Sequence, residues 1–315
     1  MRFLYNKQNP DVKLSIIILD WNCRESFHLF NYLEKQNVDR SAYEVIWIEY
    51  YDRIPKDLDA IQQRSLGLGR QAIDKWVIIE MPEDIYYHKH LMYNIGLFYA
   101  QGDYVCIMDS DVMVKDDFIQ SIVSFFDEHP KYVLHLDQFR NHNRQYYPFH
   151  EISFEEFLQN GCINDAGGVT KGLASEYDAV HRRNYGACFT APRQALLDIK
   201  GSDEHLYFLG HICGPYDLTF RLMNKGYKVH WHKEQFLYHT WHPGSDGVDN
   251  YMGPQDGKNN ALTSLMALDN GQVMPFLPNK AIEMLSEGKD KQEAEKYLFD
   301  DIRTAKWKIE NLKKQ

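Results

Sequence analysis

The chain has 315 residues, of which 44% are hydrophobic and 25% are charged, and its formal net charge is −10. This composition is that of a globular protein, and the length allows two domains or one large α/β domain with an appendage. The negative charge argues against a nucleic-acid partner, because phosphate backbones are bound by basic surfaces.

The cysteine pattern and the hydropathy of the chain bear on its location. The five cysteines are widely separated and form no Cys-x-x-Cys pair, which predicts a reduced, cytoplasmic protein rather than a disulfide framework. The N-terminus does not read as a signal peptide, and no stretch reaches the roughly 18 apolar residues of a membrane span. Peripheral contact with the inner membrane face, through the basic end of the chain, is kept as an alternative.

The first part of the chain alternates apolar runs with segments of helical periodicity. Nearly continuous apolar runs predict strands that are covered on both faces. Strands are expected at 12–19, 44–49, 75–80, 103–108 and 132–136, and helices at 24–35, 90–100 and 116–128. Gly102 is expected to cap the second helix. This alternation predicts βαβ units in a mostly parallel sheet.

The pattern is less regular after residue 137. Residues 137–184 read as an irregular insertion that contains one short helix at 154–159. Further regular segments are expected at 186–198, 216–225 with Gly226 as cap, 228–231, 235–239 and 280–312. Glycine and proline between residues 240 and 260 predict a loop, which we expect to close over a bound nucleotide.

Polar side chains follow three of the predicted strands. Asp20-Trp21-Asn22, Glu49 and Asp109-Ser110-Asp111 all stand at carboxyl ends, where parallel sheets bind their ligands. Two carboxylates two residues apart can converge on one divalent cation, which in turn bridges the phosphates of a nucleotide. The sequence therefore predicts a nucleotide and metal site around Asp109-Ser110-Asp111.

Three neighbouring motifs carry a resemblance to a known family. They are Asn94-Ile95-Gly96-Leu97, then residues 100–105 (AQGDYV), then Met108-Asp109-Ser110-Asp111. This succession resembles family 2 glycosyltransferases, as does the opening run SIIILDWN. The resemblance covers residues 12–125 and 184–244, and it implies a GT-A fold, which is a Rossmann-like, mostly parallel mixed sheet flanked by helices. It implies a catalytic domain at 1–265, divided at 136 into a nucleotide-sugar-binding half and an acceptor-binding half, with a C-terminal helical extension at 266–315.

The resemblance also implies roles for the residues at the strand ends. Asp111 would hold the metal, Asp109 would share the metal or contact the ribose, and Ser110 would line the same site. Trp21 stands where the family stacks an aromatic ring on the base. Glu49 stands where a carboxylate accepts the base N–H, which suits uracil and points to a UDP-sugar.

Basic residues and the acceptor side complete the implied site. Lys89 or His90 falls near the position that touches the phosphates. Residues 184–189 and 201–204 resemble the acceptor-side strand and turn, with Gly186 beside the acceptor. Residues 211–221 resemble the segment that carries the general base of inverting galactosyl- and N-acetylgalactosaminyl-type enzymes. Asp217 would be that base, and Tyr216 replaces a Glu that often binds the acceptor.

A third block, Tyr238 to Gly244, supplies a histidine. Some metal-dependent relatives have Tyr-His followed by Pro-Gly here, and the resemblance makes His239 a metal ligand. Because His242 is three residues further along an extended segment, we do not expect both histidines to face one metal. His242 is assigned to the acceptor site, with metal binding as its second role. Two carboxylates and an imidazole suit Mn²⁺, with Mg²⁺ as the alternative.

The sequence thus predicts a metal-dependent, inverting transferase. It would move a hexose or N-acetylhexosamine from a UDP-sugar to a hydroxyl of a glycan or glycolipid. The alternatives are a retaining transferase, a nucleotidyltransferase and a non-catalytic sugar-nucleotide- or glycan-binding protein. The absence of a glycine-rich phosphate loop near residue 20 counts against the nucleotidyltransferase.

Overall fold

A computed structural model describes the chain in several continuous stretches. The description covers all residues except 24–25, 142, 160, 164–187, 206–207, 209–214, 243–259 and 300–315. Gly186 therefore lies outside the described residues. The same holds for most of the predicted closing loop at 240–260 and for the basic C-terminal end.

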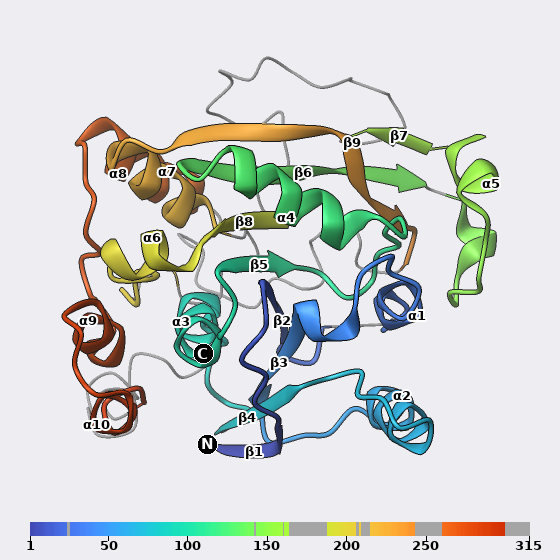
Figure 1. The fold of residues 1–315 in the computed structure, drawn as a ribbon, viewed down its shortest axis with the longest axis horizontal. Helices are drawn as coiled ribbons and strands as arrows, with labels where there is room; N and C mark the ends of the chain where they lie inside the picture. Colours follow the sequence, from blue (N-terminus) through green and yellow to red (C-terminus); the bar gives the residue numbers. More distant parts are fainter. Residues whose placement is uncertain are drawn as a thin grey trace.

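The described residues form one sheet and a set of helices (Figure 1). The strands are β1 (Arg2–Asn6), β2 (Leu14–Asp20), β3 (Tyr43–Tyr51), β4 (Lys75–Met81), β5 (Tyr104–Met108), β6 (Tyr132–Asn141), β7 (Gly161–Ile163), β8 (Cys188–Pro192) and β9 (Lys228–Thr240). The α-helices are α1 (Leu29–Leu33), α2 (Lys56–Gly67), α3 (Lys89–Tyr99), α4 (Phe118–Glu128), α5 (Phe154–Gln159), α6 (Arg193–Asp198), α7 (Tyr216–Asn224), α8 (Asn260–Asp269), α9 (Lys280–Ser286) and α10 (Lys291–Glu295).

The sheet is mixed, as predicted. Its strand order is β1-β4-β3-β2-β5-β8-β6-β7, and β9 pairs with β6. Strands β4, β3, β2 and β5 are mutually parallel, and β9 runs parallel to β6. Strand β8 is antiparallel to both β5 and β6, and so joins the two parallel groups. The carboxyl ends of β2, β3 and β5 therefore meet at one edge of the sheet.

Alternation along the buried strands supplies two cores, one on each face. In β2, Ile17 and Leu19 pack with α3, α6 and α9, whereas Ile16 and Ile18 pack with α1, α2 and α4. All seven residues of β2 are buried, which is why its sequence is a continuous apolar run. Figure 1 shows α3, α6 and α9 on one side of the sheet and α1 and α2 on the other.

Several predicted elements differ from the structure. Strand β6 continues to Asn141, beyond the expected end at 136, because its distal part pairs with β7 and β9. The two predicted segments at 228–231 and 235–239 form one strand, β9, with an irregular register against β6. The helix expected from residue 24 is described only from Leu29. Strand β1 and helix α2 were not predicted, and α2 exposes most of its polar sequence.

The predicted role of Gly102 is wrong. Helix α3 ends with Ala100 as its C-cap, two residues earlier. A Cβ atom on Gly102 would lie 2.8 Å from the backbone nitrogen of Ser15. Glycine is needed here because the chain passes directly against β2, whereas Gly226, at φ +98°, does occupy the left-handed conformation after α7.

The C-terminal helices belong to the same core as the sheet. Ala281, Ile282 and Met284 of α9 and Ala294 of α10 join the cluster that contains α3 and α6. Helix α8 spans the expected boundary between residues 265 and 266. Among the described helices, none has the length and apolar character that crossing a membrane requires.

Candidate active site

The predicted strand-end residues lie at one edge of the sheet. Asp20, the last residue of β2, is in register with Glu49 of the parallel strand β3. On the other side of β2, β5 ends at Met108, and Asp109-Ser110-Asp111 follows directly. The expected arrangement of the three polar groups at the carboxyl ends is therefore present.

The Asp-x-Asp segment is tied to the chain that follows β2. The Ser110 hydroxyl donates a hydrogen bond of 3.1 Å to the Ser26 carbonyl oxygen, and the Leu29 amide donates one of 3.2 Å to the Ser110 carbonyl oxygen. Asp111 is 5% exposed and Ser110 is fully buried. These contacts fix the backbone that presents the Asp111 carboxylate.

Asp111, His239 and His242 form a compact cluster of metal-ligating atoms. The Asp111 Oδ2 atom lies 3.2 Å from Nε2 of His242 and 3.8 Å from Nε2 of His239. The two Nε2 atoms are 3.2 Å apart, and one ligand atom from each of the three buried residues lies within 4.8 Å of the others. A backbone bridge between Met113 and Tyr238 holds β9 beside the Asp-x-Asp segment.

The expectation that the two histidines could not face one site is wrong. Strand β9 ends at Thr240, so the chain leaves its extended path before His242. Both imidazoles then reach Asp111, one from the strand and one from the residues after it. Among the described residues, Asp109 is not part of this compact group, and the second role assigned to His242 gains geometric support.

The donor set fits a divalent transition metal. One carboxylate and two imidazoles suit Mn²⁺, and burial shields the cluster from competing water. Burial lowers the pKa of His239, and the Asp111 carboxylate opposes this shift. A low pKa keeps the imidazole neutral, which is the form that binds a metal ion.

Glu49 has an arginine partner that the sequence reasoning missed. Arg53 Nε donates to Glu49 at 2.7 Å, and the same guanidinium pairs with Asp20 and Asn22. Burial, together with the Asp20 carboxylate, raises the pKa of Glu49 to about 9, and Arg53 opposes the shift. Glu49 and Arg53 are four residues apart, a spacing that brings side chains together on a helix. Because the chain is a strand up to Tyr51, the sequence pattern offered no reason to pair them.

Trp21 is enclosed by other side chains. Its indole stacks on Tyr87 with the ring centroids 4.3 Å apart, and the Lys89 ammonium lies 4.6 Å from the indole centroid. Only 7% of Trp21 is exposed. A base that stacks on Trp21 would therefore have to displace one of these partners, and the stacking role stays a prediction.

His90 is buried behind Lys89. Its Nδ1 lies 2.7 Å from the Asp203 carbonyl oxygen, and its ring stacks on Phe208. Burial holds the pKa of His90 well below its usual value. The neutral ring brings no positive charge to a phosphate, so Lys89 is the better candidate of the predicted pair.

Asp217 lies in the first turn of α7 and forms a buried ion pair with Arg221. Its carboxylate accepts from Nε of Arg221 at 2.9 Å and lies 2.8 Å from the other guanidinium nitrogen, Nη2. Arg221 also donates to backbone carbonyl oxygens of Ile199 and Val273. Tyr216 is 9% exposed and packs on Phe220. The structure thus holds Asp217 rigidly at the start of the helix.

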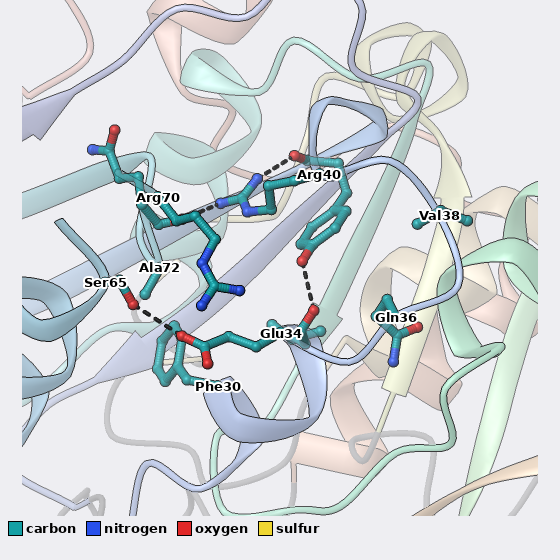
Figure 2. A pocket seen from close by; sticks show the side chains of 11 residues that line it. Phe30, Glu34, Gln36, Val38, Arg40, Ser65, Arg70 and Ala72 are labelled. Carbon is teal, nitrogen blue, oxygen red and sulfur yellow. Dashed lines mark hydrogen bonds between the residues drawn. The ribbon is translucent and has the colours of Figure 1, made fainter. Parts of the chain in front are cut away.

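A separate cavity of about 80 Å³ lies between α1, α2 and the start of β3 (Figure 2). Glu34 accepts from the Ser65 hydroxyl at its wall, and Arg40 donates to the Tyr43 carbonyl oxygen. Tyr43 is the first residue of β3, so this cavity is at the amino end of the strand. It is therefore distinct from the site at the carboxyl ends.

Comparisons with known proteins agree with this architecture. Residues 87–195 match the model of glycosyl transferase family 2. No curated protein sequence matches the chain.

The structure is similar to that of S. aureus TarS 1–349 in complex with UDP-GlcNAc, with a TM-score of 0.50 and 15% identity, over 87% of this chain and 71% of that one. A mannosyltransferase from Pyrobaculum calidifontis, solved with GDP-Man and Mn²⁺, has a TM-score of 0.49 and 12% identity over 98% of this chain and 87% of its own.

The family match covers α3, the Asp-x-Asp segment and β8, and the rest of the sheet follows the GT-A arrangement. The chain is a glycosyltransferase with a GT-A fold, similar to glycosyl transferase family 2.

Proposed function

We propose that the chain transfers a hexose or N-acetylhexosamine from a UDP-sugar to a hydroxyl of a glycan or glycolipid, in a metal-dependent reaction. The observation that carries this proposal is the buried cluster of Asp111, His239 and His242 at the carboxyl ends of the sheet. Glu49 and Asp20 lie in register at the same carboxyl-end edge of the sheet. TarS, whose fold is similar, binds UDP-GlcNAc, which makes this donor the first to test.

Each residue of the site has a separate proposed role. Asp111, His239 and His242 would hold Mn²⁺, with Asp109 toward the ribose or the same ion. A bound divalent cation stabilises the negative charge of the diphosphate as it leaves. Lys89 would add a positive charge on the phosphate side.

Asp217 is our candidate for the general base of an inverting transfer. Its carboxylate would take the proton of the acceptor hydroxyl while that oxygen attacks the sugar C1 and the bond from C1 to the diphosphate breaks. The ion pair with Arg221 orients the carboxylate, but it also occupies the Oδ2 atom of Asp217. For that reason retention is the second candidate, with Asp217 in a structural role.

A donor-hydrolysis screen tests the proposal. UDP-sugars should be turned over with Mn²⁺ and not after chelation, and D111N should lower the rate by about 1,000-fold, since several kcal/mol of charge stabilisation is lost. The exposed Asp116→Asn variant is the matched control. Metal-independent turnover, or preference for GDP-sugars, would contradict the proposal.

The anomeric outcome tests the base. NMR of the first product formed should show the inverted anomer, and D217N should retain donor binding while losing transfer. A retained anomer would contradict the assignment of Asp217 as the general base. It would not contradict the assignment of the metal ligands.

A further inference from the structure

His28 presents a buried nitrogen beside the metal cluster. The residue directly precedes α1, is 5% exposed, and was not singled out by any motif. Its Nε2 atom finds no hydrogen-bond partner among the described residues. A buried polar group in this condition costs about 1–3 kcal/mol, so such a group calls for a ligand that satisfies it.

The imidazole ring is held in a fixed orientation. Nδ1 makes a short contact with the Ser26 hydroxyl, and the ring stacks on Phe149 with centroids 3.5 Å apart and planes 8° apart. When the Ser26 hydroxyl donates to Nδ1, the ring proton sits on Nε2. The unsatisfied atom is then an N–H donor that cannot turn toward water.

The backbone around His28 is clamped to the Asp-x-Asp segment. Ser110 bonds to the Ser26 carbonyl oxygen through its hydroxyl and accepts the Leu29 amide through its own carbonyl oxygen. Burial lowers the pKa of His28 to about 3, a shift that Asp111 opposes and that His239 and His242 reinforce. His28 is thus a neutral ring in the electrostatic field of the cluster.

His28 is not one of the three residues of the compact ligand group. We propose that His28 is a donor-binding residue whose Nε2–H donates a hydrogen bond to a diphosphate oxygen of the nucleotide sugar. This inference rests on the proposed function. A neutral donor suits the position, because a buried arginine or lysine there would pay a large desolvation cost beside two imidazoles.

The test separates metal binding from diphosphate binding. His28→Phe keeps the stack on Phe149 and removes the donor. Binding of Mn²⁺ alone, followed by electron paramagnetic resonance, should change less than about twofold, and the Kd of UDP at saturating Mn²⁺ should rise by about 10-fold. Binding of uridine, which lacks phosphates, should not change. His129→Phe, at a histidine after α4, is the matched control.

Each contrary result has one meaning. An unchanged Kd for UDP would overturn the proposal, and so would loss of Mn²⁺ binding alone, which would make His28 a metal ligand. An equal rise in the Kd of uridine and of UDP would overturn it as well, because it would indicate that the substitution disturbs the whole nucleotide site. If H28F does not fold, H28M provides the same comparison. Failure of the wild-type chain to bind Mn²⁺ and UDP would instead reject the proposed function.

Discussion

Two buried carboxylates, Asp20 and Glu49, share one guanidinium at the carboxyl ends of β2 and β3. Both acids are fully buried, and Arg53 is the cation that contacts them. One guanidinium balances one negative charge, so the second carboxyl is favoured in its protonated form. The raised pKa of Glu49 is the expression of this imbalance.

This imbalance predicts a pH-dependent stability. The folded-state pKa of Glu49, about 9, lies above its ordinary value of 4.5. The stabilisation it contributes is therefore complete below the ordinary value and is lost as the pH rises through the folded one. Urea unfolding at pH 5, 7 and 9 should show E49Q gaining stability relative to wild type as the pH rises.

Exposed Glu83→Gln serves as the control for that series, and its difference from wild type should be the same at all three pH values. A difference between E49Q and wild type that does not vary with pH would reject this account of the Asp20, Glu49 and Arg53 cluster.

At the scale of elements, the family-like motif around Asn94 has a packing role. Asn94 on α3 donates to the Ser202 carbonyl oxygen and to Glu204, and it accepts the Ser202 amide. A Cβ on Gly201 would lie 2.4 Å from the Asn94 side-chain oxygen. Two motifs far apart in the sequence therefore form one joint between α3 and the turn after α6.

Gly96 sets how closely α3 lies on the sheet. A Cβ there would lie 2.7 Å from Ile17 atoms on β2, so G96A must move the helix or the isoleucine. Overpacking of this kind costs about 1–3 kcal/mol, less the roughly 1 kcal/mol that alanine gains over glycine in a helix. Urea unfolding should show a net loss of about 0–2 kcal/mol.

Gly67→Ala at the end of α2 is the matched control, because no atom lies within 4 Å of the added carbon. It should be neutral or mildly stabilising. If Ile17→Val does not recover part of the loss in G96A, contact with Ile17 is not its cause.

At the scale of the whole molecule, Asn279 connects the C-terminal helices to the turn that follows α6. The Asn279 side-chain oxygen caps α9 by accepting the Ala281 and Ile282 amides. Its amide donates to Glu204 at 2.7 Å and to the Leu298 carbonyl oxygen. The residue is 4% exposed, so these bonds are shielded from water.

Asn279→Ala should therefore lower the free energy of unfolding by about 2–4 kcal/mol, from a lost cap and unsatisfied buried partners. Asp290→Ala removes an exposed cap, that of α10, and should cost about 1 kcal/mol. Denaturant titration of both variants makes the comparison. Equal losses would show that Asn279 acts only as a local cap.

The sequence by itself determined the alternating strands and helices of the first half and the place of the Asp-x-Asp segment. These are local properties, because hydrophobic periodicity follows from which faces of each element are buried. Residues 154–159 were likewise predicted as a helix and form α5. The mixed sheet and the transferase class followed from these patterns and the motifs.

Only the tertiary structure decided which side chains meet. His242 reaches Asp111 because β9 stops at Thr240, and Arg53 contacts two carboxylates from different strands. The residues on either side of His28 are hydrogen-bonded to Ser110, which is distant in sequence. Each of these contacts depends on where chain segments distant in sequence come together. No local periodicity encodes such a meeting, because it results from the packing of the whole sheet and its helices.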